Sequence, residues 1–250
     1  MKRKERHHLK ENELIHTIEV VRNVLESRQR EVTAVLVAVV LIVVAVVGVS
    51  LVRQRNQSQG SELLAEAMVA LNAQVVPAGT QAQGEDVPAA ATLGATGSFA
   101  TEAAKLTAAL PKLQAAADAY PDSSAGITAR YHLASALTAL GRHDEAIKQF
   151  DDVVNRAGAG SLYGRMARLG KADTQAQGGQ LDAAITTWKE LAATATAELP
   201  VDAILMELAR AYVQKGNPEE ARKAFTQIVD EHPDSPYTPE ARAELDNLKS

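Results

Sequence analysis

The feature that most constrains this chain is an uncharged, apolar run from Val32 to Val52. As an α-helix that rises about 1.5 Å per residue, the run reaches about 31 Å, enough to cross the hydrocarbon core of a bilayer. Valine, isoleucine, leucine and alanine dominate every side of such a helix, so it presents no polar face to water. Within lipid, only a helix or a closed barrel satisfies its own backbone groups. The run therefore predicts a single transmembrane helix over residues 32–52.

The competing interpretation is a signal peptide cleaved after Gly48-Val49-Ser50. The charged stretch before the run is too long for such a peptide. The run is also longer than the apolar core of a signal peptide, which spans about 7–15 residues. We therefore favour a retained membrane anchor.

Lysine and arginine residues predict which side of the membrane each part occupies. Eight of them precede the run, whereas after Arg53 and Arg55 the next is Lys105. Positively charged flanks stay in the cytoplasm and acidic residues count for little in this bias, so we expect a cytoplasmic amino-terminal segment. The residues after the span are then extracytoplasmic. In a bacterium with two membranes they are periplasmic, and the protein is a single-pass protein of the inner (cytoplasmic) membrane.

The first 31 residues form a polar tail that leads into an amphipathic helix from about Glu11. Its apolar residues recur at helical spacing: Leu14, Ile15, Ile18, Val21, Val24 and Leu25. Such a helix rests on the bilayer surface, pairs with itself or packs on a partner. His7 and His8 have no suitable third ligand nearby, so we expect no metal site there.

Small residues within the anchor, Ala34, Ala38, Ala45 and Gly48, fall on one face of the helix. A stripe of small side chains lets another membrane helix approach closely, which makes these residues a candidate transmembrane packing stripe. Alanine is also common in such spans by chance. The span contains no ionisable residue, so it provides no ion or proton path of its own.

Composition limits the remaining chemistry. The absence of Cys excludes disulfides, thiolate zinc sites and cysteine nucleophiles. A 4% aromatic content and abundant alanine favour closely packed helices over a sheet. The formal net charge of -5 argues against a domain that binds nucleic acid, so we expect protein partners.

The residues from 53 to 98 are expected to connect the anchor to a folded domain. Gln54 to Gly60 is predicted to be a polar spacer, and Ser61 to cap a helix that runs to about Val76. The segment 77–98 is rich in Pro, Gly and Ala and has no helical period, which predicts a loop or a disordered insertion.

From Phe99 onward, a motif of Gly, then Ala, then an aromatic residue recurs at intervals of about 37 to 38 residues. The first helices of the units also align, with a small residue at the same place in each. The three copies of the motif are Gly141/Ala146/Phe150, Gly179/Ala184/Trp188 and Gly216/Ala221/Phe225, and the aligned small residues are Ala134, Ala172 and Ala209.

This pattern resembles the tetratricopeptide repeat (TPR), in which a small residue sits where two helices cross and an aromatic fills the gap beside it. Pro121 and Pro233 match the proline that closes each TPR unit. The earlier proline implies a further, split repeat, whose second helix holds Ala109, Leu113 and Ala116, and a final helix from Thr238 caps the array. We therefore predict an all-α protein: one amino-terminal transmembrane helix, then a TPR-like α-solenoid of about three to four helix pairs over residues 99–250.

The inward side of the first helices is the candidate protein-binding groove. Its residues are Tyr131, Ser135, Leu169, Asp173, Met206 and Arg210. The alternative is that these side chains are merely solvated or packed within the superhelix. TPR proteins that clamp a peptide carboxylate place Lys, Asn and Arg there. Only Arg210 fits, so the resemblance predicts no such clamp.

No catalytic, cofactor or metal motif stands out. A nucleophile-elbow triad, HExxH and a phosphate-binding loop are all absent from the sequence. Carboxylate pairs such as Asp144-Glu145 occur at helix starts, where they complement the helix dipole. We expect a non-enzymatic protein with no cofactor and no small-molecule substrate.

The layout of residues 32–250 resembles that of the YfgM-like ancillary subunits of the SecYEG translocon. That resemblance implies a membrane-tethered adaptor for protein-protein interaction in envelope protein translocation or periplasmic chaperoning. Its expected partners are translocon subunits or periplasmic chaperones. The alternative is an accessory structural subunit of a larger membrane protein complex, held by the anchor stripe and the amphipathic helix.

Overall fold

A computed structural model describes residues 29–76, 98–194, 199 and 201–248. These residues form nine helices and one pair of short strands. The chain divides into two units, Met1–Arg55 and Asn56–Ser250, each of which is described by itself. The apolar residues of the predicted amphipathic helix, Leu14 to Leu25, and residues 77–97 of the predicted insertion lie outside the described residues.

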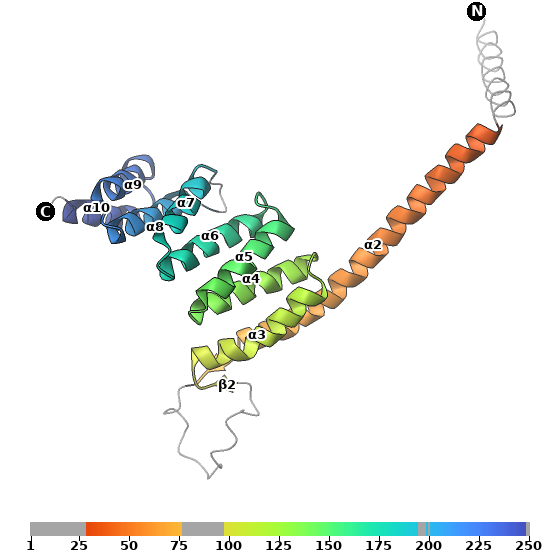
Figure 1. Cartoon of the computed structure of the whole chain (residues 1–250), viewed down its shortest axis with the longest axis horizontal. Helices are drawn as coiled ribbons and strands as arrows, with labels where there is room; N and C mark the ends of the chain where they lie inside the picture. The colour runs from red at the N-terminus through yellow and green to blue at the C-terminus, as the bar shows by residue number, and fades with distance from the viewer. Residues whose placement is uncertain (1–28, 77–97, 195–198, 200, 249–250) are drawn as a thin grey trace, which may run out of the picture. The chain divides into compact units, whose positions relative to one another are not determined.

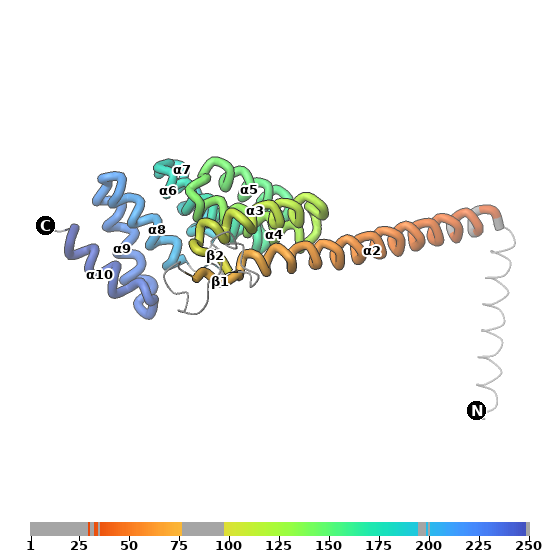
Figure 2. The backbone as a smooth tube through the Cα atoms, turned by 90° about the horizontal axis from the view of Figure 1, so that it is seen from below, coloured from red at the N-terminus to blue at the C-terminus, as the bar shows by residue number. Residues whose placement is uncertain are grey.

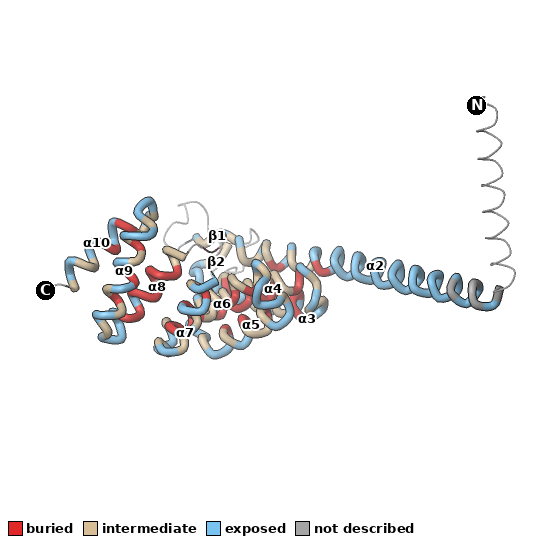
Figure 3. The backbone as a smooth tube through the Cα atoms, turned by 90° about the horizontal axis from the view of Figure 1, so that it is seen from above, coloured by how far each residue is buried: buried red, intermediate tan, exposed pale blue. Residues whose placement is uncertain are grey.

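The first unit contains most of helix α2 (Gln29–Leu71). The large apolar side chains between Leu36 and Val52 are each at least half exposed, and pale blue covers this part of α2 in Figure 3. By length and composition the helix is able to cross a membrane, and none of its most apolar window is buried in the protein. The prediction of an apolar helix that follows the amino-terminal tail is therefore confirmed.

The predicted spacer at residues 54–60 is wrong, because α2 runs through it without a break. Ser61 does not cap a new helix, since its hydroxyl donates to the Gln57 carbonyl at 2.7 Å, one turn back in the same helix. Arginine and glutamine are good helix formers and the stretch contains no proline, so extending an existing helix is easier than starting a new one. The helix also ends earlier than predicted, at Leu71 rather than Val76.

The second unit is a series of helices, each of which packs on the next (Figures 1 and 2). Strand β1 (Gln74–Val75) pairs in parallel with β2 (Ser98–Phe99), with Gln74 opposite Ser98 and Val75 opposite Phe99. The predicted all-α fold is confirmed. The helices are α3 (Glu102–Ala119), α4 (Ser124–Ala139), α5 (His143–Ala157), α6 (Leu162–Gln177), α7 (Leu181–Ala192), α8 (Val201–Gln214), α9 (Pro218–Glu231) and α10 (Thr238–Asn247).

The split pair predicted upstream of the repeats is present. Ala67, near the end of α2, is fully buried in one cluster with Ala109 and Leu113 of α3. Glu66 of α2 and Lys112 of α3 form a salt bridge of 3.1 Å. The end of α2 therefore serves as the first helix of this pair, and α3 serves as its second.

Three complete pairs follow, α4–α5, α6–α7 and α8–α9, and their predicted packing residues are buried (Figure 3). Ala134, Ala172 and Ala209 are fully buried where the first helices meet their neighbours. Each pair is covered by the next, and α10 covers the last one with the fully buried Ala241. The aromatic residues of the motif, Phe150, Trp188 and Phe225, are at most 2% exposed.

The recurring glycine of the motif has a backbone cause. Gly141, Gly179 and Gly216 end the first helix of each complete pair with φ values of 73°, 78° and 74°. Residues with a Cβ rarely adopt this left-handed conformation, which reverses the chain into the second helix. The glycine of the motif is thus required by the turn within each pair.

A second glycine position, at the start of the first helices, was not predicted. Ser123 and Ser161 cap α4 and α6, and each hydroxyl accepts a hydrogen bond of 3.0 Å from the amide of the glycine three residues on, Gly126 or Gly164. A Cβ on either glycine would lie 2.0 Å from a carbonyl oxygen of the preceding loop. Glycine is therefore needed there for close approach of the loop.

Candidate protein-binding surface

The first helices α4, α6 and α8 carry the residues predicted to bind a partner. Tyr131 of α4 is half-buried, and its ring meets the rings of Phe150 and Tyr163 edge to face, with centroids 5.8 Å and 6.0 Å apart. Ser135, one turn further along α4, donates to the Tyr131 carbonyl at 3.1 Å. The aromatic contacts hold Tyr131 in place between α5 and α6.

On α6, Leu169 is half-buried and packs against the core formed by α7 and α8. Asp173 is one turn further along and is also half-buried. The Trp188 indole of α7 donates a hydrogen bond of 3.2 Å to Asp173 Oδ1. Of these two residues, only Asp173 has a polar group to offer a ligand.

On α8, the two predicted residues differ in exposure. Met206 is fully buried in the core, so its side chain presents no surface to a partner. Its place in the repeat matches those of Tyr131 and Leu169, but methionine is flexible and fills gaps between packed helices. Arg210 is exposed, and its guanidinium makes two contacts of 2.6 Å, with Glu207 and with Glu240 of α10.

Electrostatic interactions connect the three helices. The pKa of Asp173 is raised to about 6, first by burial and then by the nearby Glu207 carboxylate, against the lowering effect of the Trp188 hydrogen bond. Burial also raises the pKa of the Tyr131 phenol. The side-chain hydrogen bond with Ser135 lowers this pKa, whereas the charge of Asp173 raises it. We call the set Tyr131, Ser135, Leu169, Asp173, Glu207 and Arg210 the α4–α6–α8 surface.

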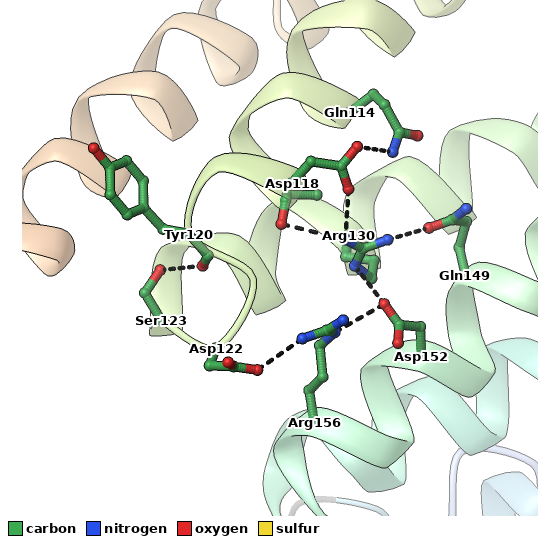
Figure 4. Close-up of polar contacts among 10 residues, drawn as sticks. Gln114, Asp118, Tyr120, Asp122, Ser123, Arg130, Gln149, Asp152 and Arg156 are labelled. Carbon is green, nitrogen blue, oxygen red and sulfur yellow. Dashed lines mark hydrogen bonds and ion pairs between the residues drawn. The ribbon is translucent and has the colours of Figure 1, made fainter. Parts of the chain in front are cut away.

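A separate polar cluster joins α3, α4 and α5 (Figure 4). Arg130 is buried, and its guanidinium contacts Asp118 at 2.7 Å and Asp152 at 2.9 Å. It also donates to Gln149 Oε1 at 2.8 Å and to the carbonyl of Ala117 at 3.2 Å. This cluster ties the split pair to the first complete pair, and the Arg130 charge is compensated by carboxylates of the protein itself, although Nε forms no hydrogen bond.

At the edge of the cluster, Arg156 of α5 bridges Asp152 at 2.9 Å and Asp122 of the α3–α4 loop at 2.7 Å. The pKa of Asp118 is lowered, first by the hydrogen bond from Gln114 and then by Arg130, against the opposing effect of burial. The cluster was not predicted, because its members lie up to several tens of residues apart and share no motif. A single arginine between apolar positions of α4 was the available signal.

Within the ranges that the structure describes, no three His, Cys, Asp or Glu side chains are arranged to hold a metal ion. His132 is half-buried, and burial lowers its pKa. The described geometry is that of paired helices with a partly exposed polar surface.

Comparison with known proteins identifies the architecture. The tetratricopeptide repeat family model matches residues 100–161 and 169–236, together just over half of the chain. The chain belongs to the tetratricopeptide repeat family. The TPR match runs from α3 to α9 except for residues 162–168 at the start of α6, and the first helix of the split pair lies before it.

Solved structures share the fold. Two crystal structures of a Podosopora anserina protein with nearly identical TPR-like repeats, one of them with a single substitution, match with 21% identity and a TM-score of 0.50. They cover 58% of this chain and 77% and 78% of theirs. A tetratricopeptide repeat protein from Parabacteroides merdae matches with 16% identity and a TM-score of 0.49, over 58% of this chain and 54% of that chain. No curated protein sequence matches this chain.

TPR arrays are scaffolds for protein-protein interaction, so the family supports a protein-binding role rather than an enzymatic one.

Proposed function

We propose that this protein is a single-pass membrane adaptor whose TPR repeats hold another protein outside the cytoplasm. The observation that carries the proposal is an exposed apolar helix on the same chain as a TPR array. A helix with this composition is soluble in lipid rather than in water. A repeat array acts by binding other molecules through its surface.

The proposed orientation in the membrane rests on the distribution of Lys and Arg along the sequence. The amino-terminal segment is rich in Lys and Arg, whereas none occurs between Arg55 and Lys105. This asymmetry favours a cytoplasmic amino terminus and an extracytoplasmic, in bacteria periplasmic, repeat domain. The layout supports a role near the protein translocation machinery of the inner membrane, with translocon subunits or periplasmic chaperones as partners.

The binding surface in this proposal is the α4–α6–α8 surface. Tyr131, Asp173 and Arg210 lie on successive first helices and are at least partly exposed. Aromatic and arginine side chains are enriched at protein interfaces, where they contribute most of the binding energy. Met206 is omitted because it is buried.

Cysteine labelling tests the orientation. The chain has no Cys, so Asn155→Cys, on the exposed side of α5, and His8→Cys each create a single thiol. We expect a membrane-impermeant thiol reagent to label Asn155→Cys in intact cells once the outer membrane is permeabilised. His8→Cys should be labelled only after lysis. The reverse pattern would show that the repeats are cytoplasmic and would overturn the proposal.

The second candidate function is an accessory structural subunit of a larger membrane complex, held through the anchor. The observation that favours it is the stripe of Ala34, Ala38, Ala45 and Gly48, which is exposed on α2. Nothing lies within 4 Å of a Cβ placed on Gly48, so this face is open to a neighbouring helix.

Bulky substitutions in the anchor separate the two functions. If the protein is a structural subunit, Ala38→Leu with Ala45→Leu should release a fixed set of membrane proteins that otherwise co-purifies in mild detergent. The matched control is Val40→Leu with Val47→Leu, on the opposite face of the same helix. An adaptor should keep its partners in both variants, and also when an unrelated transmembrane helix replaces residues 32–52. Quantitative mass spectrometry of the purified complexes provides the measurement.

A further inference from the structure

Asp173 is a partly buried carboxylate that forms no salt bridge within the described part of the chain. The neutral indole of Trp188 donates a hydrogen bond to it, at 3.2 Å. The groups that interact electrostatically with it are Tyr131 of α4, Trp188 of α7 and Glu207 of α8. None of these is positively charged, and Glu207 adds a second negative charge.

In the buried Arg130 cluster, a charged side chain with a structural role is surrounded by groups that compensate its charge. Arg130 is surrounded by two carboxylates, an amide oxygen and a backbone carbonyl. Asp173 lacks an equivalent counter-charge, and burial together with Glu207 raises its pKa to about 6. At neutral pH the surface therefore carries a carboxylate whose charge the protein leaves uncompensated, a condition found more often at functional sites than elsewhere.

The neighbours of Asp173 decide what kind of ligand suits it. Arg210 is the cation of this surface, but its guanidinium is already held by Glu207 and Glu240 at 2.6 Å. Tyr131 adds a half-buried aromatic ring, which attracts a cation over its face. A carboxylate ligand would be repelled by Asp173 and Glu207, whereas an ammonium or guanidinium group would be attracted to both.

We propose that the α4–α6–α8 surface binds a segment of a partner protein that places a lysine or arginine side chain against Asp173. This inference rests on the proposed function, because it names the chemistry of the partner that the repeats hold. The incoming cation replaces the counter-charge that the fold omits, while Trp188 keeps the carboxylate in position. The charge complementarity favours a basic segment over a carboxylate terminus.

Trp188 provides a direct reporter, since it is the single tryptophan of the chain and hydrogen-bonds to Asp173. In the full chain in detergent micelles, we expect the emission of Trp188 to change as Asp173 titrates, with a midpoint at about pH 6. The Asp173→Asn variant should lose this transition. The matched control is Asp151→Asn on α5, whose carboxylate is paired with Lys171 at 2.6 Å, and this variant should keep the transition.

A displayed library of short random peptides without tryptophan provides the binding probe. We expect selection on the full chain to enrich peptides that contain Lys or Arg. Replacing that residue with Gln should weaken binding about tenfold or more, as should Asp173→Asn, for loss of a close charge pair. Because protonation removes the charge of Asp173, affinity should fall about tenfold between about pH 7.5 and about pH 5, and binding should lower the pH midpoint of Trp188 emission.

The outcomes separate this inference from the function on which it rests. Enriched peptides without a basic residue, or with equal affinity for wild type and Asp173→Asn, would overturn the inference. If Tyr131→Ala abolishes their binding, the proposed peptide-binding function still stands. If no peptide binds the wild-type chain, both fail. A change in Trp188 emission with calcium chloride alone would assign Asp173 to an ion site and would also overturn the inference.

Discussion

Gly126→Ala and Gly164→Ala should each destabilise the repeat array by about 3 kcal/mol, because each glycine lies against the backbone of the preceding loop. A Cβ at Gly126 would lie 2.0 Å from the carbonyl oxygen of Tyr120, and one at Gly164 would lie 2.0 Å from that of Gly158. A flexible side chain could rotate away from such a contact, but a backbone carbonyl cannot. The loop must move, and the serine cap of the helix is then weakened as well.

The matched control is Gly160→Ala, in the same loop as Gly158. Nothing lies within 4 Å of a Cβ on Gly160, and its backbone does not adopt the left-handed conformation. Its substitution should change stability by less than about 0.5 kcal/mol. The measurement is urea unfolding of the full chain in detergent, followed by amide hydrogen exchange of α4 and α6. Equal stabilities for Gly160→Ala and Gly164→Ala would mean that the loop is free to adapt.

The repeated helix pairs were predictable because their signals are local. A glycine ends each first helix, an alanine lies at the crossing, and an aromatic follows at a fixed distance. Three copies of this pattern reinforce one another, so the fold class, the split pair and the final helix α10 all follow from spacing. The serine and glycine at the starts of α4 and α6 form a similar signal, but it is present at only two positions and was overlooked.

The candidate surface was predictable only in part. The repeat register gives the direction of a side chain, but not how far the neighbouring helices cover it. Tyr131 and Met206 occupy the same place in their pairs, and yet one is half-buried and the other has no exposed surface. The missing counter-charge at Asp173 depends on four helices at once, so no local pattern reveals it.

At the predicted polar spacer, local composition led to a wrong prediction of secondary structure. Residues 54–60 have the composition of a linker, but α2 enters them as a formed helix and continues to Leu71. Gly60 in particular suggests a break. It is instead buried, and a Cβ there would lie 3.3 Å from the Ala125 Cβ and 3.2 Å from the Ser123 hydroxyl. Close packing within the repeat unit explains this glycine better than chain flexibility does.

Arg130→Met should destabilise the junction of α3, α4 and α5 by about 3 kcal/mol, because it leaves the partners of a buried cation without their counter-charge. The Arg130 side chain is 8% exposed, and it connects Asp118 of α3 to Asp152 of α5. Its loss also leaves the Ala117 carbonyl without the hydrogen bond that the guanidinium donates. Asp118 and Asp152 reach solvent in part, which places the effect at the lower end of the range for a broken buried pair.

The matched control is Arg156→Met, at the exposed edge of the same cluster. Arg156 bridges Asp122 and Asp152, but its side chain is 30% exposed, so the loss should be below about 1 kcal/mol. Hydrogen exchange of the full chain should show faster opening of α3, α4 and α5 in Arg130→Met, with α8 and α9 unchanged, since each pair contacts only its neighbours.

Acid provides an independent check on the Arg130 cluster. The pKa of Asp118 is lowered in the folded protein, first by Gln114 and then by Arg130, so the ionised carboxylate stabilises the fold. That stabilisation is complete at neutral pH, above the pKa of the unfolded chain, and is lost as the pH falls through the lowered pKa. The wild-type chain should therefore lose local stability at α3 on acidification below about pH 4, and Arg130→Met should lose less. An equal loss in both proteins would show that Arg130 does not stabilise the Asp118 charge.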